Sequence, residues 1–247
     1  MKKNGEEVLI DFLDIPNMKI FQKNDHFNFS IDSVLLANFL TINRKLKNIT
    51  ELGFGNGAVS LLLSKRTSAK ITGIEILKDS YELAKKNINI NNLENRIEII
   101  HDDMKNWKKH LKEQSQDAVI SNPPFFKNSD INNLDQLSIA RHEIAITLEE
   151  IIFISGKLLR NMGYFAIVHR AERFYEILNI MKKNKIEPKR IKFCYTTKNK
   201  NSKIVLIEGK KNSKEGIIIE QPLYINKENG EYTEIVKKMF AGEIDKI

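Results

Sequence analysis

The stretch that decides the fold of this chain is Ile49-Thr50-Glu51-Leu52-Gly53-Phe54-Gly55-Asn56-Gly57-Ala58-Val59-Ser60. It is typical of a short strand, a glycine-rich turn and the start of a helix, which continues to Lys65. Glycine permits positive φ and lets a ligand approach the backbone closely, and the N-terminus of the following helix offers unpaired N–H groups. The stretch therefore predicts an α/β fold with a ligand at the glycine turn.

A second motif, Asn122-Pro123-Pro124-Phe125, directly follows the apolar strand Ala118-Val119-Ile120. Two prolines in a row cannot continue a strand, because they remove two hydrogen-bond donors and stiffen the turn. The motif offers an amide side chain, a rigid carbonyl and an aromatic ring, the groups that an amino nucleophile needs. It resembles the catalytic tetrapeptide of S-adenosylmethionine (SAM) dependent methyltransferases that modify exocyclic or amide nitrogens. This resemblance implies Asn122, Pro123 and Phe125 as catalytic residues and SAM as the cofactor.

The glycine turn by itself fits two kinds of cofactor. Gly53, Gly55 and Ala58 also satisfy the fingerprint of NAD-binding enzymes. Glu51 favours SAM, because a carboxylate two residues before the first glycine would repel a pyrophosphate but suits the ammonium group of SAM. We therefore expect Glu51, Gly53, Gly55 and Gly57 to bind SAM.

Acidic residues close two further predicted strands. Glu75 lies at the end of the strand 70–76, near the usual spacing for a carboxylate that accepts both ribose hydroxyls. The strand 96–100 is followed by Asp102 and Asp103. In methyltransferases that the motif resembles, an acid at this place accepts a hydrogen bond from the cofactor adenine. We favour Asp103 for this role and expect the other aspartate to be the N-cap of a turn over 104–107.

Ser30 precedes an amphipathic helix that reaches Phe39. Serine is a favoured N-cap residue, so Ser30 is a candidate cap. The resemblance implies that this helix covers the methionine end of the cofactor, which makes Ser30, like Asn122, a candidate cofactor contact as well.

Alternating strands and helices along the rest of the chain predict a mostly parallel sheet. The last two strands, near 189–196 and 203–209, are expected to pair in antiparallel orientation at its edge. The resemblance implies a Rossmann-like class I methyltransferase fold, with a seven-stranded, mostly parallel sheet and an antiparallel edge strand. We expect one domain over residues 1–247, with an N-terminal extension and cofactor-covering helix over 1–45 and the catalytic core over 46–247.

The composition bears on the cellular location of the protein and on its metal and disulfide content. The 247 residues include one cysteine, Cys194, so neither an internal disulfide nor a cysteine cluster for a metal is expected. No stretch approaches the roughly 20 apolar residues of a membrane span, and the first six residues lack the apolar core of a signal peptide. These features predict a cytoplasmic protein without metal or membrane contact, and imply no stable protein partner.

Positive charge is concentrated between Lys182 and Lys214. That segment holds twelve Lys and Arg against Glu187 and Glu208, a net of +10, while the whole chain carries +8. The remainder is therefore slightly acidic, at −2. Such asymmetry predicts a nucleic-acid contact, although solvated strand edges and loops are the alternative.

From Phe27 to Thr233 the chain resembles bacterial adenine-N6 methyltransferases that act on position 37 of a valine tRNA. The resemblance implies tRNA, held at its anticodon loop by the basic segment, as the substrate and partner. Protein-glutamine N5-methyltransferases and guanine-N2 rRNA methyltransferases share the architecture and remain alternatives, as does a SAM-binding RNA protein without turnover. The polar stretch 127–136 is a candidate lid. The run Arg141-His142-Glu143 is a candidate contact for the entering nucleotide.

Overall fold

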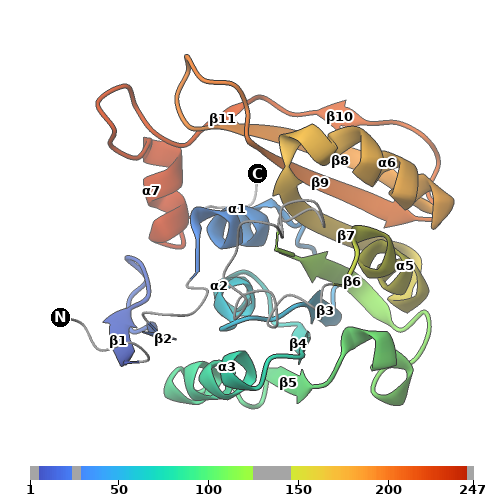
Figure 1. Cartoon of the computed structure of the whole chain (residues 1–247), viewed down its shortest axis with the longest axis horizontal. Coiled ribbons are helices and arrows are strands. Elements are labelled where there is room, and N and C mark those ends of the chain that lie inside the picture. The colour runs from blue at the N-terminus through green and yellow to red at the C-terminus, as the bar shows by residue number, and fades with distance from the viewer. Residues whose placement is uncertain (1–5, 24–28, 125–145, 244–247) are drawn as a thin grey trace, which may run out of the picture.

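A mostly parallel sheet is the middle layer of the computed structural model, which describes residues 6–23, 29–124 and 146–243 (Figure 1). Its strands lie in the order β10-β8-β9-β7-β6-β3-β4-β5, and β11 also pairs with β8. The main strands are β3 (Asn48–Leu52), β4 (Lys70–Glu75), β5 (Ile97–His101), β6 (Gln116–Ser121), β7 (Leu159–Arg170), β8 (Ile186–Tyr195) and β9 (Ile204–Lys211). The short strands β10 (Ile218–Ile219) and β11 (Leu223–Tyr224) extend the edge beside β8.

The predicted α/β fold is confirmed, and β3 to β9 are its seven main strands; the short β10 and β11 bring the described sheet to nine strands. β9 runs antiparallel to β7 and to β8, whereas β6 is parallel to both β7 and β3. The expected antiparallel pairing of β8 and β9 is therefore present. The antiparallel strand, β9, lies between β7 and β8 and not at the edge of the sheet, where it was predicted. The register of β8 shifts between Pro188 and Arg190. A bulge suits proline, which lacks the N–H that a regular ladder requires.

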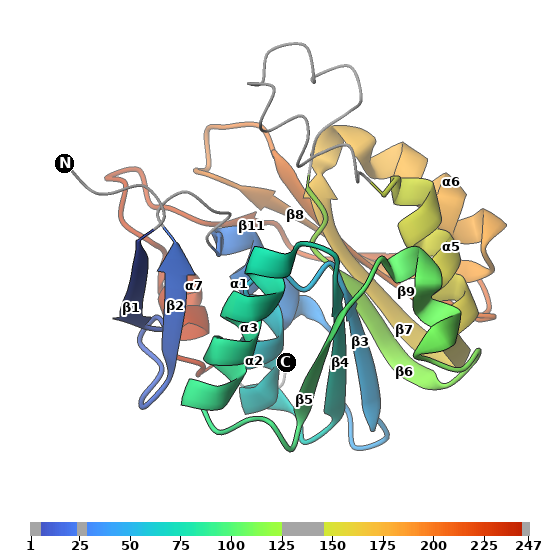
Figure 2. The same ribbon diagram turned by 60° about the horizontal axis from the view of Figure 1, so that its bottom comes forward.

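Helices cover both faces of the sheet (Figure 2). One face carries α1 (Ile31–Phe39), α2 (Ala58–Arg66) and α3 (Lys78–Ile90), and their apolar residues form one core cluster with β3 and β4. The other carries the 3-10 helix η1 (Met104–Lys109) with α5 (Leu148–Leu158) and α6 (Phe174–Lys183), which form the second cluster. A second 3-10 helix, η3 (Ala171–Arg173), follows β7, and α7 (Glu234–Phe240) packs near α1.

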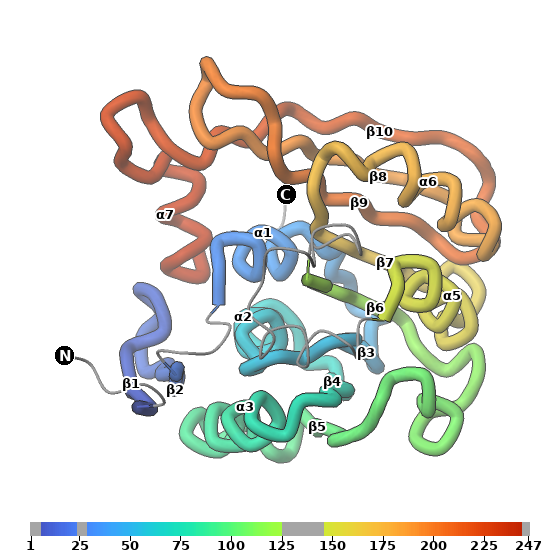
Figure 3. The backbone as a smooth tube through the Cα atoms, viewed as in Figure 1, coloured from blue at the N-terminus to red at the C-terminus, as the bar shows by residue number. Residues whose placement is uncertain are grey.

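An N-terminal hairpin lies outside the layer of α1, α2 and α3, next to α3 (Figure 3). It consists of β1 (Glu7–Asp11) and β2 (Lys19–Lys23), paired in antiparallel orientation. Asn87 of α3 and Asn91, the C-cap residue of α3, bind the backbone of the hairpin: the amide oxygen of each accepts an N–H of β2, and the amide nitrogen donates to the carbonyl of that same β2 residue. The hairpin is an element that the sequence interpretation did not predict.

Candidate active site

The predicted site residues converge where four neighbouring strands end. β6, β3, β4 and β5 are parallel and adjacent, so their carboxyl ends meet at one edge of the sheet, the usual place for ligands in open α/β folds. Asn122 follows β6, the glycine turn follows β3, Glu75 ends β4, and Asp102 and Asp103 follow β5. We call this the catalytic edge, and the end of the sheet where these strands begin the far edge.

All three glycines of the turn have left-handed backbone angles, with φ of +78° at Gly53, +55° at Gly55 and +87° at Gly57. A Cβ at Gly57 would lie 2.8 Å from the ring of Phe54, so that glycine makes room for the buried phenylalanine. A Cβ at Gly55 would meet nothing within 4 Å. The backbone at Gly55 therefore borders open space, as a turn that lets a ligand approach closely should.

Glu75 is buried beside this turn and binds it directly. One carboxylate oxygen accepts the N–H of Gly55 and the other that of Leu77, both at 2.8 Å. Burial raises the pKa of Glu75, and these backbone N–H groups oppose the rise. A carboxylate offers about four acceptor sites, so Glu75 retains capacity for a ligand hydroxyl beside its backbone contacts. The geometry fits the ribose role expected for Glu75.

Glu51 on β3 is almost completely buried, with 1 % of its surface exposed. The hydroxyl of Ser60 donates a hydrogen bond to its carboxylate. Burial raises the pKa of Glu51 to about 8; the Ser60 hydrogen bond opposes this rise and the charge of Glu75 adds to it. In the described part of the chain no Lys, Arg or His forms an ion pair with Glu51. A cationic group on a ligand would supply the missing partner.

The two aspartates after β5 have different surroundings. Asp102 uses both oxygens: one accepts from the backbone N–H of Asp103 and from Asn106, and the other lies 2.7 Å from His110. The hydrogen bonds from His110 and Asn106 lower the pKa of Asp102 to about 2. Asp103 is the N-cap of η1, and one of its oxygens accepts the N–H of Lys105 at 2.8 Å.

The expectation that Asp102 would be the N-cap is therefore wrong, because Asp103 is the cap. Capping occupies only one oxygen of Asp103. Its second oxygen makes no hydrogen bond with the described residues, whereas both oxygens of Asp102 are engaged. Asp103 thus retains an acceptor for a ligand, and its assignment to the cofactor adenine stays a prediction.

Asn122 is half-buried directly after β6, and a residue that sequence interpretation missed holds its side chain. The amide nitrogen of Asn122 donates to the hydroxyl of Ser33 on α1 at 3.2 Å. Next to it, the hydroxyl of Ser121 donates to the carbonyl of Leu52 at 2.8 Å, which ties the ends of β6 and β3 together. Occupation of the amide nitrogen by Ser33 leaves the amide oxygen of Asn122 for a substrate.

Three predicted features lie outside the described residues: Phe125, the candidate lid 127–136 and the run Arg141-His142-Glu143. Pro123 is buried and Pro124 is exposed.

Ser30 occupies the N-cap position of α1, as predicted, but its side chain makes no capping hydrogen bond. Its hydroxyl instead donates to Asp32 at 3.3 Å. Burial raises the pKa of Asp32, and the Ser30 hydrogen bond and the charge of Arg170 oppose the rise. The positive charge of Arg170, the last residue of β7, therefore acts on the first turn of α1, next to the catalytic edge. A cofactor contact for Ser30 stays a prediction.

In the basic segment 182–214, cations in the middle of β8 form ion pairs and hydrogen bonds within the protein. Arg190 donates to the carboxylates of Glu208 and Glu220, to the hydroxyl of Thr41 and to the carbonyl of Phe39. Lys192 pairs with Glu220 at 2.8 Å. The segment therefore does not present all of its positive charge to a ligand.

Within the described ranges, no helix is both long enough and apolar enough to span a membrane. The same residues contain no cluster of three or more His, Cys, Asp or Glu side chains placed to hold a metal ion.

Comparisons with known proteins give a consistent picture. Residues 26–192 match the model of the methyltransferase small domain family. A tRNA1(Val) (adenine(37)-N6)-methyltransferase of Flavobacterium psychrophilum is 29 % identical over 76 % of this chain and 82 % of its own length. One of the same name from Aliivibrio salmonicida is 28 % identical over 72 % of this chain and 75 % of its own.

Among solved structures, a predicted O-methyltransferase from Agrobacterium tumefaciens superimposes with a TM-score of 0.69. At 19 % identity, the match covers 86 % of this chain and 96 % of that protein. This likeness supports the fold assignment.

Proposed function

Because the chain belongs to the methyltransferase small domain family, we propose that it transfers a methyl group from SAM to the N6 amine of adenine 37 in a valine tRNA. The substrate is the one that its curated relatives are named for. The observation that carries the chemistry is the position of Asn122 at the catalytic edge, held by Ser33 and adjacent to the glycine turn. The proposal treats residues 1–247 as one domain.

The cofactor site is proposed to consist of the glycine turn with Glu51, Glu75 and Asp103. The open backbone at Gly55 leaves room for the ligand. Glu75 faces the ribose hydroxyls, the free oxygen of Asp103 accepts from the adenine amine, and Glu51 pairs with the ammonium group. When bound, SAM supplies an electrophilic methyl group on a sulfonium sulfur.

The protein's part in the reaction is to orient the target amine. The nitrogen lone pair of an adenine amine is delocalised into the ring. In this proposal the side-chain oxygen of Asn122 and the carbonyl of Pro123 would accept the two amine hydrogens, which would leave the lone pair free to bond to the methyl carbon as the methyl–sulfur bond breaks. The methylated nitrogen, acidified by its positive charge, would then release one of these hydrogens as a proton to water. Alignment of the two reacting atoms supplies much of the rate, and no strong base is needed. We assign stacking of the target base to Phe125.

The proposal is tested by replacing Asn122 with Ala. Single-turnover methylation of a valine tRNA transcript should fall at least about 100-fold, the scale for loss of one oriented hydrogen-bonding group at a reacting centre. SAM and tRNA affinities should change little, since Asn122 acts on the target amine. Asn184→Ala is the matched control, because Asn184 is also half-buried and its amide donates one hydrogen bond, to Ile180, at the far edge.

Full activity of Asn122→Ala would refute the mechanism. The substrate is tested separately with methyl-labelled SAM offered to total RNA and to a protein extract. Label in tRNA, at adenine 37 by nucleoside mass spectrometry, supports the proposal. Label in protein glutamine or in rRNA guanine would replace the substrate assignment, and no label in any fraction would indicate a binding protein without turnover.

A further inference from the structure

The direction of β8 and β9 divides the basic segment between the two ends of the sheet. β8 begins at the far edge and ends at the catalytic edge, and β9 returns in the opposite direction. The loop over residues 196–203 that joins them therefore projects at the catalytic edge, at the same end of the sheet as the end of β6 (Figure 2). β8 has ten residues, so the two ends of the segment are about 30 Å apart.

Three lysines lie on the loop at the catalytic edge: Lys198, Lys200 and Lys203. All three are exposed, and none forms an ion pair or side-chain hydrogen bond with another described residue. The carbonyl of Lys203 accepts the N–H of Ala171 at 2.9 Å, which fixes the loop beside the end of β7. We refer to them as the catalytic-edge lysines.

Arg170 extends this positive surface toward the active site. Arg170, Glu172, Ser202 and Lys203 line a cavity of about 310 Å³. Among the described residues, the acidic groups in this region include Glu172, which lines the same cavity, Glu228, which binds Asn199 of the loop at 3.4 Å, and Asp32, which lies within the electrostatic influence of Arg170.

The distance from this surface to the reacting centre follows from the strand register. Ile167 of β7 lies opposite Ser121, which directly precedes Asn122, and Arg170 lies three residues further along, about 10 Å. β9 lies two strand spacings from β6, again about 10 Å, and begins opposite Arg170. Arg170 and the catalytic-edge lysines therefore lie on the β7–β9 side of Asn122, next to the backbone of a nucleotide whose base is held there.

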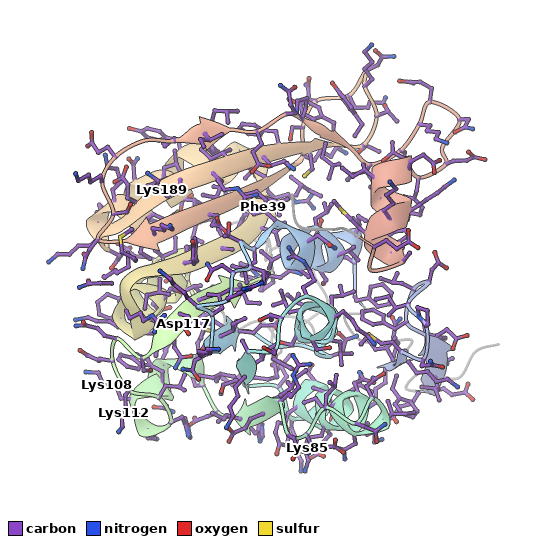
Figure 4. All side chains as sticks on the ribbon, turned by 180° about the vertical axis from the view of Figure 1, so that it is seen from behind. Phe39, Lys85, Lys108, Lys112, Asp117 and Lys189 are labelled. Carbon is purple, nitrogen blue, oxygen red and sulfur yellow. The ribbon has the colours of Figure 1, made fainter. Side chains whose placement is uncertain are left out.

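The lysines at the far edge have a different environment. Lys189 donates to the carbonyls of Lys214 and Glu215, and Lys211 donates to that of Asn184. Figure 4 shows Lys189 toward the same end of the sheet as Asp117, at the start of β6. Lys183, Lys185 and Lys214 are exposed and without an ion pair to a described residue. They match the catalytic-edge lysines in number, charge and exposure, and differ in position.

We propose that the RNA backbone is bound by the catalytic-edge lysines together with Arg170. The exposed lysines at the far edge, Lys183, Lys185 and Lys214, do not contact the RNA in this proposal. This inference rests on the proposed function, because it places the bound nucleotide at Asn122. Phosphate binding by Lys and Arg releases counterions, and each contact adds about 0.7–0.9 to the slope of log affinity against log salt. Three lysines should therefore contribute about 2–3 to the magnitude of the slope of log affinity against log salt.

Two triple variants of the full chain test the inference: Lys198→Gln, Lys200→Gln, Lys203→Gln, and the control Lys183→Gln, Lys185→Gln, Lys214→Gln. Binding of an unmodified valine tRNA transcript is measured at several salt concentrations, with SAM affinity as the folding control. The first triple should bind tRNA about 10-fold more weakly or worse, with a slope reduced by about 2–3. The control triple should retain the wild-type affinity and slope.

The outcomes separate the inference from the proposed function. If the wild type methylates tRNA but both triples bind it equally well, or the control triple loses more, the inference is overturned and the proposed function stands. If the wild type neither binds nor methylates tRNA, the substrate assignment falls and the inference falls with it. Retained SAM affinity in both triples excludes misfolding as the cause of any difference.

Discussion

Glu51 and Glu208 are two glutamates on strands of the same sheet, each with 1 % of its surface exposed, but their surroundings are opposite. Glu208 on β9 accepts hydrogen bonds from the backbone and hydroxyl of Thr41, at 2.6 and 2.7 Å, and from Arg190 at 3.1 Å. Glu51 on β3 has the hydroxyl of Ser60 and a second carboxylate, Glu75, as its electrostatic neighbours. Burial raises the pKa of both.

We interpret Glu208 as a structural carboxylate and propose that Glu51 is a ligand-binding one. A buried charge is tolerated when it is paired and fully hydrogen-bonded. Arg190 and Thr41 meet that need for Glu208 within the protein and hold α1 against β8 and β9. Glu51 obtains no cation from the described part of the chain, so its favourable partner is expected to arrive with the ligand.

Removal of the Glu208 charge should produce the largest effect. Glu208→Gln removes the more buried of the two carboxylates that pair with Arg190 and leaves only Glu220, and we expect a loss of about 3–5 kcal/mol in the free energy of unfolding, measured with urea. The control is Glu215→Gln, because Glu215 is 86 % exposed and pairs with Lys182 at 3.6 Å. A surface pair of this kind should cost about 0–1 kcal/mol. Equal small losses in both variants would contradict the structural role of Glu208.

Glu51 should instead make stability depend on pH. Its pKa is about 8 in the folded protein against 4.5 ordinarily, so between these values the folded state binds more protons than the unfolded state. The contribution of Glu51 to stability is therefore fully present below about pH 4.5 and is lost as the pH rises to about 8. Since one pKa unit corresponds to about 1.4 kcal/mol, the wild type should lose about 3 kcal/mol relative to Glu51→Gln between about pH 5 and pH 8.

Urea unfolding of both proteins across this range measures the difference, and parallel curves would mean that Glu51 is ionised throughout. SAM should reduce the pH dependence of the wild type, because a bound ammonium group favours the ionised carboxylate. NAD, which lacks this group, should leave it unchanged.

The affinity of Glu75 variants for SAM tests whether Glu75 is also a ligand-binding carboxylate. Glu75→Ala should weaken SAM binding by about 1–3 kcal/mol in calorimetry, because charged hydrogen bonds to the ribose are lost. Glu98→Ala serves as the control, since Glu98 is an exposed strand glutamate on the neighbouring β5. Unchanged affinity in Glu75→Ala would remove Glu75 from the site.

The features that sequence predicted well are local in the chain. The glycine turn, the apolar strands and the acids at strand ends depend on neighbouring residues, and parallel strands bring those ends together without further information. The contact between Ser33 and Asn122 joins residues 89 positions apart and has no local signal. The N-cap assignment was wrong because Asp102 and Asp103 are equally good caps by composition. The choice depends on how the chain folds back over the next eight residues, which brings His110 to Asp102.

The basic segment shows a second limit. A count of charges cannot tell a lysine on a loop from an arginine that holds the sheet to α1, and Arg190 alternates with apolar residues as a surface cation would. The pairing of β8 and β9 is needed to show which cations form ion pairs within the protein and at which edge of the sheet the other cations lie.

The hydrogen bonds of the Asn87 and Asn91 side chains to the backbone of β2 affect the tendency of the protein to aggregate. Four residues of a helix rise about 6 Å and two residues of a strand about 7 Å, so Asn87 and Asn91 match Lys19 and Phe21 as a neighbouring strand would. An exposed strand edge is a template for intermolecular β-pairing and aggregation. The two asparagines occupy that edge of β2 with side chains that cannot propagate a sheet, and so keep a strand of another molecule from pairing with this edge of the hairpin.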